Sequence, residues 1–182
     1  MTPTILIVPG LRNHVAGHWQ TLLEASLPNA VCVPPLEVDK LSCAARVAAL
    51  DQALAEIVGP VILVAHSAGV TTTVHWARQH QRRIHGAVLA TPPDLDTPAP
   101  QGYPTKDVLE MNGWLPVSRE RLPFPSIVAA SRNDPLGAFD RVWVLASAWG
   151  SRLVDLGEVG HLNPASGFGE WPLAQSLVQE LV

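Results

Sequence analysis

The sequence lacks the features that bind nucleic acid or a membrane. Lys and Arg number 12 against 16 Asp and Glu, a net charge of −4, so no basic field attracts phosphate groups. The longest apolar runs, Ile5 to Val8 and Val61 to Ala65, fall far short of the roughly 20 residues of a membrane-spanning helix. The opening residues, Met1-Thr2-Pro3, carry no basic stretch and no long apolar segment. We therefore expect a cytoplasmic protein with no nucleic acid partner and no membrane contact.

Cysteine is equally scarce. Cys32 and Cys43 are the two cysteines of the chain and have no CxxC spacing, so we expect small buried hydrophobic groups and no disulfide or zinc site. His14 and His18 are four residues apart and could face one side of a helix, but no carboxylate or cysteine accompanies them nearby in the sequence. We therefore expect no metal and no cofactor.

The chain does have enough apolar residues for one substantial core. Of its 182 residues, 47% are apolar and 15% are charged, whereas disordered chains have few apolar residues and much unbalanced charge. A chain of this length buries about two thirds of its unfolded surface. No repeat or shift in composition marks a boundary, so residues 1–182 are expected to form a single domain.

Short β-branched runs alternate with longer amphipathic stretches from one end of the chain to the other. This alternation predicts an α/β fold with a mainly parallel six-stranded sheet and helices on both faces. The expected strands are Thr4 to Val8, Ala30 to Val33, Val61 to Ala65, Gly86 to Ala90, Ser126 to Ala130 and Arg152 to Leu156. The expected helices are His18 to Ser26, Cys43 to Ile57, Gly69 to His80, Phe139 to Trp149 and Leu173 to Leu181.

Two stretches carry more specific expectations. In the expected helix from Cys43 to Ile57, the periodicity places Arg46 on the polar side, away from the apolar residues. Residues 91 to 125 contain eight prolines, which we expect to break any regular element. Within them, residues 96 to 118 are a hypothesised lid or insert whose removal would alter substrate range and leave the fold intact.

The five residues Ala65-His66-Ser67-Ala68-Gly69 link a buried strand to an expected helix. A strand, a sharp turn bearing Ser and a helix form the nucleophile elbow of α/β hydrolases. Small residues two positions before and two after the Ser let the neighbouring backbones approach, although Ala65 stands where Gly is usual. Taken alone, such a Ser is more often a helix cap.

Two later residues change that interpretation. Asp134 follows the fifth expected strand and His161 follows the sixth, so the order Ser, Asp, His is that of α/β hydrolases. All three side chains would lie at one rim of the sheet, where open α/β folds bind ligands. His161 would accept the proton of Ser67, and Asp134 would orient and stabilise the imidazole. Asp155 and Glu158 are weaker candidates for the acid.

The oxyanion of an acyl-transfer reaction requires hydrogen-bond donors. The backbone N–H of Ala68, at the start of a helix, is expected to be one donor. The other is assigned to the backbone N–H of Leu11, because Gly10 allows the loop after the first strand to approach the site. Pro9 stands where many esterases have His, and the chain has no HGGG motif.

Four aromatic residues are candidates for the substrate pocket. His18 and Trp19 follow the loop after the first strand and are expected at the mouth, although a Trp at a helix start often packs in a core. Trp171 follows His161 by ten residues and is expected to wall the acyl pocket, with core packing as the alternative. Trp114 lies in the hypothesised lid.

Long motifs in nearly the whole chain resemble the small serine hydrolases of the retinoblastoma-binding protein 9 and YdeN type. They are Val8-Pro9-Gly10, Gly17-His18-Trp19-Gln20, Leu63 to Gly69, Leu122 to Ser126, Ala130 to Pro135, Gly160 to Asn163 and Ser166 to Pro172. The resemblance implies a compact α/β hydrolase without a large cap domain, using Ser67, Asp134 and His161. It implies no particular substrate.

The sequence therefore predicts a cofactor-free serine hydrolase that cleaves a small-molecule ester, thioester or amide through an acyl-enzyme on Ser67. The alternative is a hydrolase-shaped module that binds a protein partner and has little or no activity; the missing HGGG motif favours it. A nucleotide-binding flavodoxin-like domain fits the alternation of strands and helices, but Pro9 to His14 lack a phosphate-cradling glycine pattern.

Overall fold

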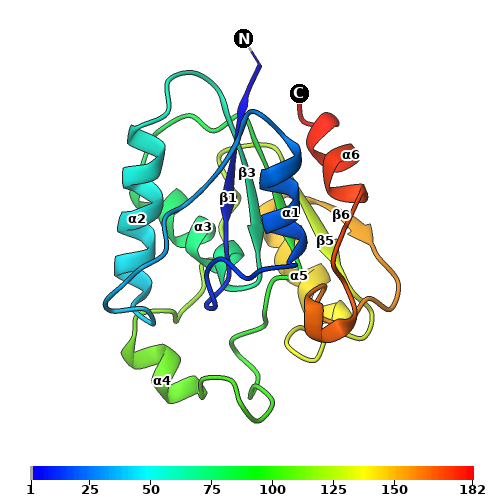
Figure 1. Cartoon of the computed structure of the whole chain (residues 1–182). Helices are drawn as coiled ribbons and strands as arrows, with labels where there is room; N and C mark the ends of the chain where they lie inside the picture. Colours follow the sequence, from blue (N-terminus) through cyan, green and yellow to red (C-terminus); the bar gives the residue numbers. More distant parts are fainter. Residues whose placement is uncertain (1) are drawn as a thin grey trace.

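A single parallel sheet of six strands forms the centre of the molecule (Figure 1). The computed structural model describes residues 2–182 of the chain. The strands are β1 (Thr4–Val8), β2 (Ala30–Cys32), β3 (Val61–His66), β4 (Gly86–Ala90), β5 (Ser126–Ala130) and β6 (Arg152–Asp155). Their order is β2-β1-β3-β4-β5-β6, and every neighbouring pair is parallel. The chain reverses direction across the sheet between β1 and β3, and ligands in open α/β sheets bind at such a switch point.

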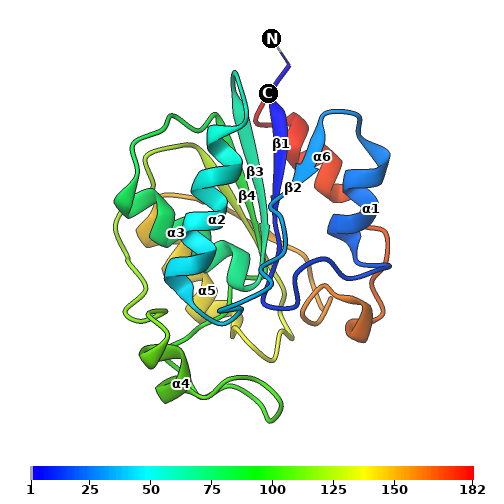
Figure 2. The ribbon, with the colours of Figure 1, turned by 60° about the vertical axis from the view of Figure 1, so that its left-hand side comes forward.

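Helices cover both faces of the sheet. The helices are α1 (Trp19–Ser26), α2 (Cys43–Ala55), α3 (Ala68–Gln79), α4 (Lys106–Met111), α5 (Phe139–Trp149) and α6 (Leu173–Gln179), with a short 3-10 turn, η1 (Pro164–Ser166). Figure 2 shows α2, α3 and α5 on one side of the strands and α1 and α6 on the other. None of the helices in residues 2–182 is long and apolar enough to span a membrane.

Strand alternation divides the core into two apolar layers. In β1, Leu6 and Val8 pack with the α2, α3 and α5 side, whereas Ile5 and Ile7 pack with the α1 and α6 side. Successive side chains of a strand point to opposite faces, so both sets must be apolar when helices cover both faces. Each fully buried aliphatic side chain contributes about 1.5–3 kcal/mol, which explains why the strands are continuous apolar runs.

The expected fold class is confirmed, and all six expected strands and all five expected helices are present. Boundaries differ at a few ends: β2 stops at Cys32 and β6 at Asp155, while β3 continues to His66. In α2 the last helical residue is Ala55 instead of Ile57, just before Gly59 and Pro60. These shifts fall where strands and helices fray, and they do not change the arrangement.

The expectation that residues 91–125 contain no regular element is wrong. Helix α4 forms from Lys106 to Met111, and its first turn is capped by Thr105, whose Oγ1 accepts a hydrogen bond from the Val108 N–H at 3.4 Å. The prolines flank this helix, at Pro104 and Pro116, and none lies inside it. Proline disrupts a helix only where it interrupts the backbone hydrogen bonds, so the stretch between these two prolines can form a helix.

Candidate active site

Ser67 occupies a sharp turn between β3 and α3. Its backbone has φ 55° and ψ −126°, a conformation that costs a non-glycine residue about 1–3 kcal/mol. Its N–H donates to the carbonyl of Ala90 at 3.0 Å, which ties the turn to β4. Gly69 is required behind the turn, because a Cβ there would lie 2.8 Å from the Pro9 carbonyl oxygen. The strained turn projects the Ser67 side chain from the carboxyl end of the sheet.

The structure brings Ser67, His161 and Asp134 into one hydrogen-bonded chain. Nε2 of His161 lies 2.8 Å from Oγ of Ser67, and Nδ1 lies 2.9 and 3.0 Å from the two carboxylate oxygens of Asp134. A carboxylate only accepts, so Nδ1 carries the proton and Nε2 has a lone pair directed at the Ser67 hydroxyl. His161 and Asp134 are both buried, at 4% and 8% exposure, which keeps water from competing for these bonds.

The rival acid Asp155 has a different set of partners. It accepts from Nε of Arg132 at 2.8 Å and from the N–H of Gly157 at 2.9 Å. The Arg132 hydrogen bond and the turn N–H hold the pKa of Asp155 below its usual range. Asp134 is therefore the carboxylate that contacts the imidazole of His161.

Polar side chains join the loop of His161 to the loop of Asp134. Asn133 accepts from the N–H of Gly160 at 2.6 Å, and Ser131 accepts from the N–H of Val159 at 3.2 Å. Ser166, in η1, accepts from the N–H of His161 at 3.0 Å. No sequence motif marks Ser131, Asn133 and Ser166 as supports; their one signal is that polar residues flank Asp134 and His161 in otherwise ordinary loops.

The imidazole of His66 lies next to that of His161, and the imidazole of His18 lies next to that of His66. Nε2 of His66 donates to the backbone carbonyl of His161 at 2.9 Å, and the ring centroids of His66 and His18 are 4.7 Å apart. Burial, with the nearby His161 and His18, holds the pKa of His66 well below its usual range. Burial, with His161 and His14, lowers the pKa of His18 to about 4, and its Nδ1 accepts from the N–H of Gln20. Both rings are neutral supports at neutral pH.

The backbone N–H groups of Ala68 and Leu11 have no protein acceptor among residues 2–182. Gly10 lies against Ser67, because a Cβ built on it would be 3.3 Å from Cβ of Ser67. This close approach brings the peptide that carries the Leu11 N–H beside Ser67. The two N–H groups are therefore free to bind an oxygen atom of a ligand at this position.

Arg46 is a buried cation that holds this loop. It is 6% exposed, and its guanidinium donates to the carbonyls of Gly10 at 3.1 Å, Leu11 at 2.9 Å and Lys40 at 2.9 Å. In a trans peptide the C=O and the N–H point in opposite directions, so fixing the Gly10 carbonyl also fixes the Leu11 N–H. The expectation that Arg46 lies on a polar helix face is wrong, because the side chain is buried against the loop after β1.

A cavity of about 410 Å³ opens beside Ser67 and His161. Its walls are mostly apolar and include Leu11, Val15, Leu95, Tyr103, Leu109, Trp114 and Leu136. Arg12 and Lys40 also line it, and no Asp or Glu of residues 2–182 does. The cavity therefore fits an apolar group, with positive charge at its wall.

The four aromatic candidates separate into two pairs. His18 and Trp114 line the cavity, whereas Trp19 and Trp171 do not. Trp19 is 1% exposed and packs edge to face on Trp171, with ring centroids 4.8 Å apart, in the core layer between the sheet and helices α1 and α6. The expectation that Trp19 and Trp171 form a pocket wall is corrected, because Trp19 begins α1 with its ring in the core layer and Trp171, just before α6, packs on that ring.

His14 and His18, which are four residues apart in the sequence, have different surroundings in the fold. His18 caps α1 and faces the cavity, whereas His14 lies in the preceding loop and pairs with Glu24 at 3.6 Å. Cys32 lies beside His14 and Glu24. A carboxylate and a cysteine therefore lie near His14 in the fold although neither is nearby in the sequence, because α1 and β2 bring distant parts of the chain to this loop.

The comparison with protein families agrees with this geometry. A model of the serine hydrolase family matches residues 5–180. The chain belongs to the serine hydrolase family. This serine hydrolase is also similar to a YdeN-like hydrolase from Pectobacterium atrosepticum, at 32% identity and a TM-score of 0.81, covering 100% of this chain and 93% of that one. The resemblance to YdeN-type serine hydrolases is thus confirmed.

More distant structures share the fold of this serine hydrolase. The YdeN protein of B. subtilis is 18% identical with a TM-score of 0.77, covering 99% of this chain and 98% of that one. The N-formylmaleamic acid deformylase of Pseudomonas putida S16 is 14% identical with a TM-score of 0.68, covering 97% and 92%. A search of curated proteins finds no significant match.

Proposed function

We propose that this serine hydrolase cleaves a carboxylic ester, thioester or amide through an acyl-enzyme on Ser67, with His161 as general base and Asp134 as its orienting acid. The observation that carries the proposal is the hydrogen-bonded chain from Ser67 Oγ to His161 Nε2, 2.8 Å, and from His161 Nδ1 to Asp134, 2.9 Å. These are the contacts that proton transfer from the nucleophile requires.

The reaction proceeds in two halves. Oγ of Ser67 attacks the carbonyl carbon while Nε2 of His161 takes the hydroxyl proton, and the carbonyl oxygen becomes an oxyanion. The N–H groups of Leu11 and Ala68 donate to that oxyanion, and Asp134 stabilises the imidazolium. The tetrahedral species collapses, and the leaving group departs with the proton from His161. Water then attacks the acyl-enzyme with His161 again as base, which releases the acid and restores Ser67.

The cavity supports an apolar acyl group as the preferred substrate. Its apolar wall offers hydrophobic contact along most of its surface, and this contact increases with the apolar area that the substrate buries. Arg12 and Lys40 favour a substrate with negative charge over one with positive charge. We expect kcat/KM of p-nitrophenyl esters to rise from acetate to hexanoate.

Labelling with a fluorophosphonate probe tests the proposed nucleophile. We expect a single adduct on Ser67, located by mass spectrometry, and no labelling of Ser67→Ala or His161→Ala. Asp134→Asn should label about 10²- to 10⁴-fold more slowly, since the imidazole loses its orienting carboxylate. Ser147→Ala is the matched control, because Ser147 is an exposed serine on α5 that bonds only within its own helix.

The contrary result is equally clear. If folded wild-type protein fails to react at any pH between about 6 and 9, where a histidine base is available, the triad is not functional. A hydrolase-shaped module that binds a protein partner would then explain the sequence better. For each variant, circular dichroism shows whether loss of labelling reflects loss of the fold.

A further inference from the structure

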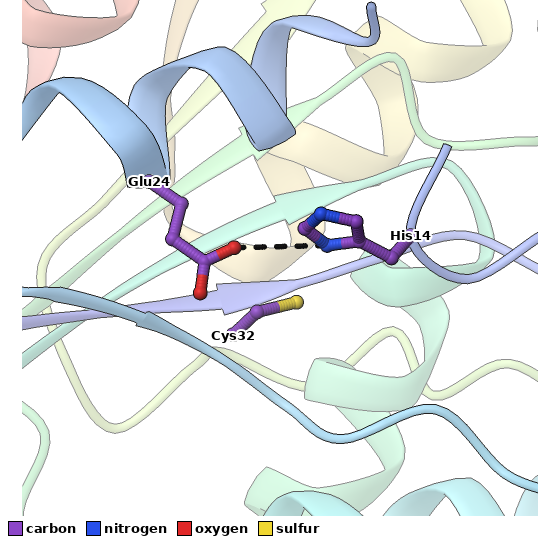
Figure 3. A group of neighbouring side chains, drawn as sticks. All are labelled: His14, Glu24 and Cys32. Atoms are coloured by element: carbon purple, nitrogen blue, oxygen red, sulfur yellow. Dashed lines mark ion pairs between the residues drawn. The ribbon is translucent and has the colours of Figure 1, made fainter. Parts of the chain in front are cut away.

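Three side chains that could bind a metal converge outside the cavity. His14 comes from the loop after β1, Glu24 from α1 and Cys32 from the edge strand β2, and their ligand atoms all lie within 4.8 Å of one another. Figure 3 shows the imidazole and the carboxylate facing each other, with the sulfur beside the space between them. Elements distant in the sequence thus bring a nitrogen, an oxygen and a sulfur ligand to one place.

No strong contact within the protein accounts for this convergence. Nδ1 of His14 and Oε2 of Glu24 are 3.6 Å apart, too long for a hydrogen bond. Among residues 2–182 neither side chain has another ion pair or hydrogen-bond partner, and Sγ of Cys32 has one weak contact, to the carbonyl of Val33 at 3.4 Å. The three groups therefore retain lone pairs that a cation can use.

The spacing fits a small tetrahedral ion. Zn²⁺ binds nitrogen and oxygen ligands at about 2.0–2.2 Å and sulfur at about 2.3 Å, which puts neighbouring tetrahedral ligands roughly 3.3–3.6 Å apart. The 3.6 Å between His14 and Glu24 matches that separation, and Cys32 comes within range by a small side-chain movement. Hard cations such as Mg²⁺ and Ca²⁺ prefer oxygen ligands alone, so thiol and imidazole favour Zn²⁺.

We propose that His14, Glu24 and Cys32 bind one Zn²⁺ ion, with water as the fourth ligand. The ion links the loop after β1 to α1 and β2. His14 and Glu24 are partly exposed, with side chains 45% and 30% accessible, so the ion can reach its ligands from solvent. The same loop lines the cavity through Asn13 and Val15, so the ion stabilises a loop that borders the substrate cavity.

Coordination changes the protonation of one ligand. Burial, with the Glu24 carboxylate, raises the pKa of the Cys32 thiol to about 12. The thiol therefore carries its proton in the metal-free protein, and that proton passes to solvent when the sulfur binds zinc as a thiolate. The resulting site has one imidazole, one thiolate and one carboxylate, and the two anionic ligands balance the charge of the ion.

Titration of the full-length, tag-free protein with Co²⁺ tests the site, because tetrahedral Co²⁺ reports its ligands by absorption. We expect one ion per chain and a near-ultraviolet band for thiolate-to-cobalt charge transfer, which Zn²⁺ displaces. Cys32→Ala should remove the band. Cys43→Ala is the matched control and should keep it, because Cys43 is 3% exposed and packs in the other core layer.

Affinity and stability give two further measurements. His14→Ala and Glu24→Gln should each weaken Zn²⁺ binding at least about tenfold, since each removes one of three protein ligands. Zn²⁺ should raise the unfolding temperature of wild type and Cys43→Ala and leave that of Cys32→Ala unchanged, because a ligand stabilises only the fold that binds it.

Three results would overturn the proposal. Wild-type protein that is folded and binds no Co²⁺ lacks the site. A charge-transfer band that survives Cys32→Ala assigns the sulfur ligand elsewhere. Binding that is lost in His18→Ala but kept in Glu24→Gln locates the ion between His14 and His18 instead. If Cys32→Ala does not fold, His14→Ala and Glu24→Gln decide, because both side chains are partly exposed.

Discussion

Arg46 holds two carbonyls of the loop after β1. It is buried, no carboxylate among residues 2–182 pairs with it, and its hydrogen bonds there go to three backbone carbonyls, two of them on the loop that carries the Leu11 N–H. A buried cation without a counter-ion is costly, so its three carbonyl contacts must offset its desolvation.

We expect Arg46→Met to lower kcat by about tenfold or more with little change in KM, because the loosened Leu11 N–H serves the oxyanion more than the bound ester. Steady-state hydrolysis of a p-nitrophenyl ester measures this split. Arg46→Lys should recover part of the rate, since an ammonium can still reach one carbonyl. Arg78→Met is the matched control, because Arg78 forms a surface ion pair with Glu120. Equal kcat in wild type and Arg46→Met would contradict the positioning role.

At the scale of elements, residues 91–125 consist of unlike parts. Residues 96 to 102 are exposed, and Gly102, Tyr103 and Pro104 line the cavity. Trp114, by contrast, is 1% exposed, belongs to the core beneath α2 and α3, and donates from Nε1 to the carbonyl of Leu41 at 2.7 Å. Removal of the whole stretch from 96 to 118 would therefore take away part of the core. The segment that can act as a lid is therefore limited to residues 96–104, called the exposed part below.

This exposed part begins and ends at fixed points. Before it, Arg141 on α5 donates from Nε to the carboxylate of Asp94 at 2.8 Å. Burial acts to raise the pKa of Asp94, but the hydrogen bonds from Arg141 and the neighbouring backbone outweigh it and hold the pKa below its usual range. After it, Thr105 caps α4. A change between these points can therefore alter the cavity without moving the sheet.

We expect replacement of residues 98–104 by a flexible glycine and serine linker to leave the fold intact and to change selectivity between short and long acyl esters several-fold. The physical reason is the loss of the cavity wall formed by Tyr103 and Pro104. Circular dichroism, thermal unfolding and kcat/KM for an ester series measure the two effects. Trp114→Ala is the contrasting variant and should destabilise the fold by about 3–5 kcal/mol. Unfolding of the linker variant would show that the exposed part is structural.

For the whole molecule, the buried histidines make stability depend on pH. The pKa of His18 falls to about 4 and that of His66 lies well below its usual range, both chiefly because of burial. In the unfolded chain both return to about 6.5. As the pH falls below about 6.5, the unfolded chain therefore binds protons that the folded chain does not bind. The free energy of unfolding decreases as a result.

We expect this decrease to begin near pH 6.5 and to continue to about pH 4 for His18, at up to about 1.4 kcal/mol per pH unit for each histidine. Neither group contributes a slope above pH 7.5. Urea unfolding between pH 5 and 8 measures it. His18→Asn, which keeps a helix-capping side chain and does not titrate, should reduce the slope by up to one proton. The same slope in wild type and His18→Asn would contradict the assignment to His18.

The sheet, the elbow and the order of the three site residues can all be predicted from local sequence patterns. The strands are short apolar runs because both faces of the sheet are covered, and that need is written locally at every position. Ser67, between Ala65 and Gly69, signals its sharp turn in five adjacent residues. Asp134 and His161 follow strands of a parallel sheet, so topology alone puts them at one rim.

The side chains that support that rim, by contrast, are fixed by packing between elements that are distant in the sequence. Arg46 bonds to carbonyls that are 35 and 36 residues away in the chain, so no local period distinguishes it from the exposed arginines. Trp171 packs on Trp19, and Glu24 and Cys32 meet His14, for the same reason. Local patterns record whether a side chain faces apolar surroundings. They do not record which distant group completes its hydrogen bonds or its ligand set, because that choice is made when the layers pack.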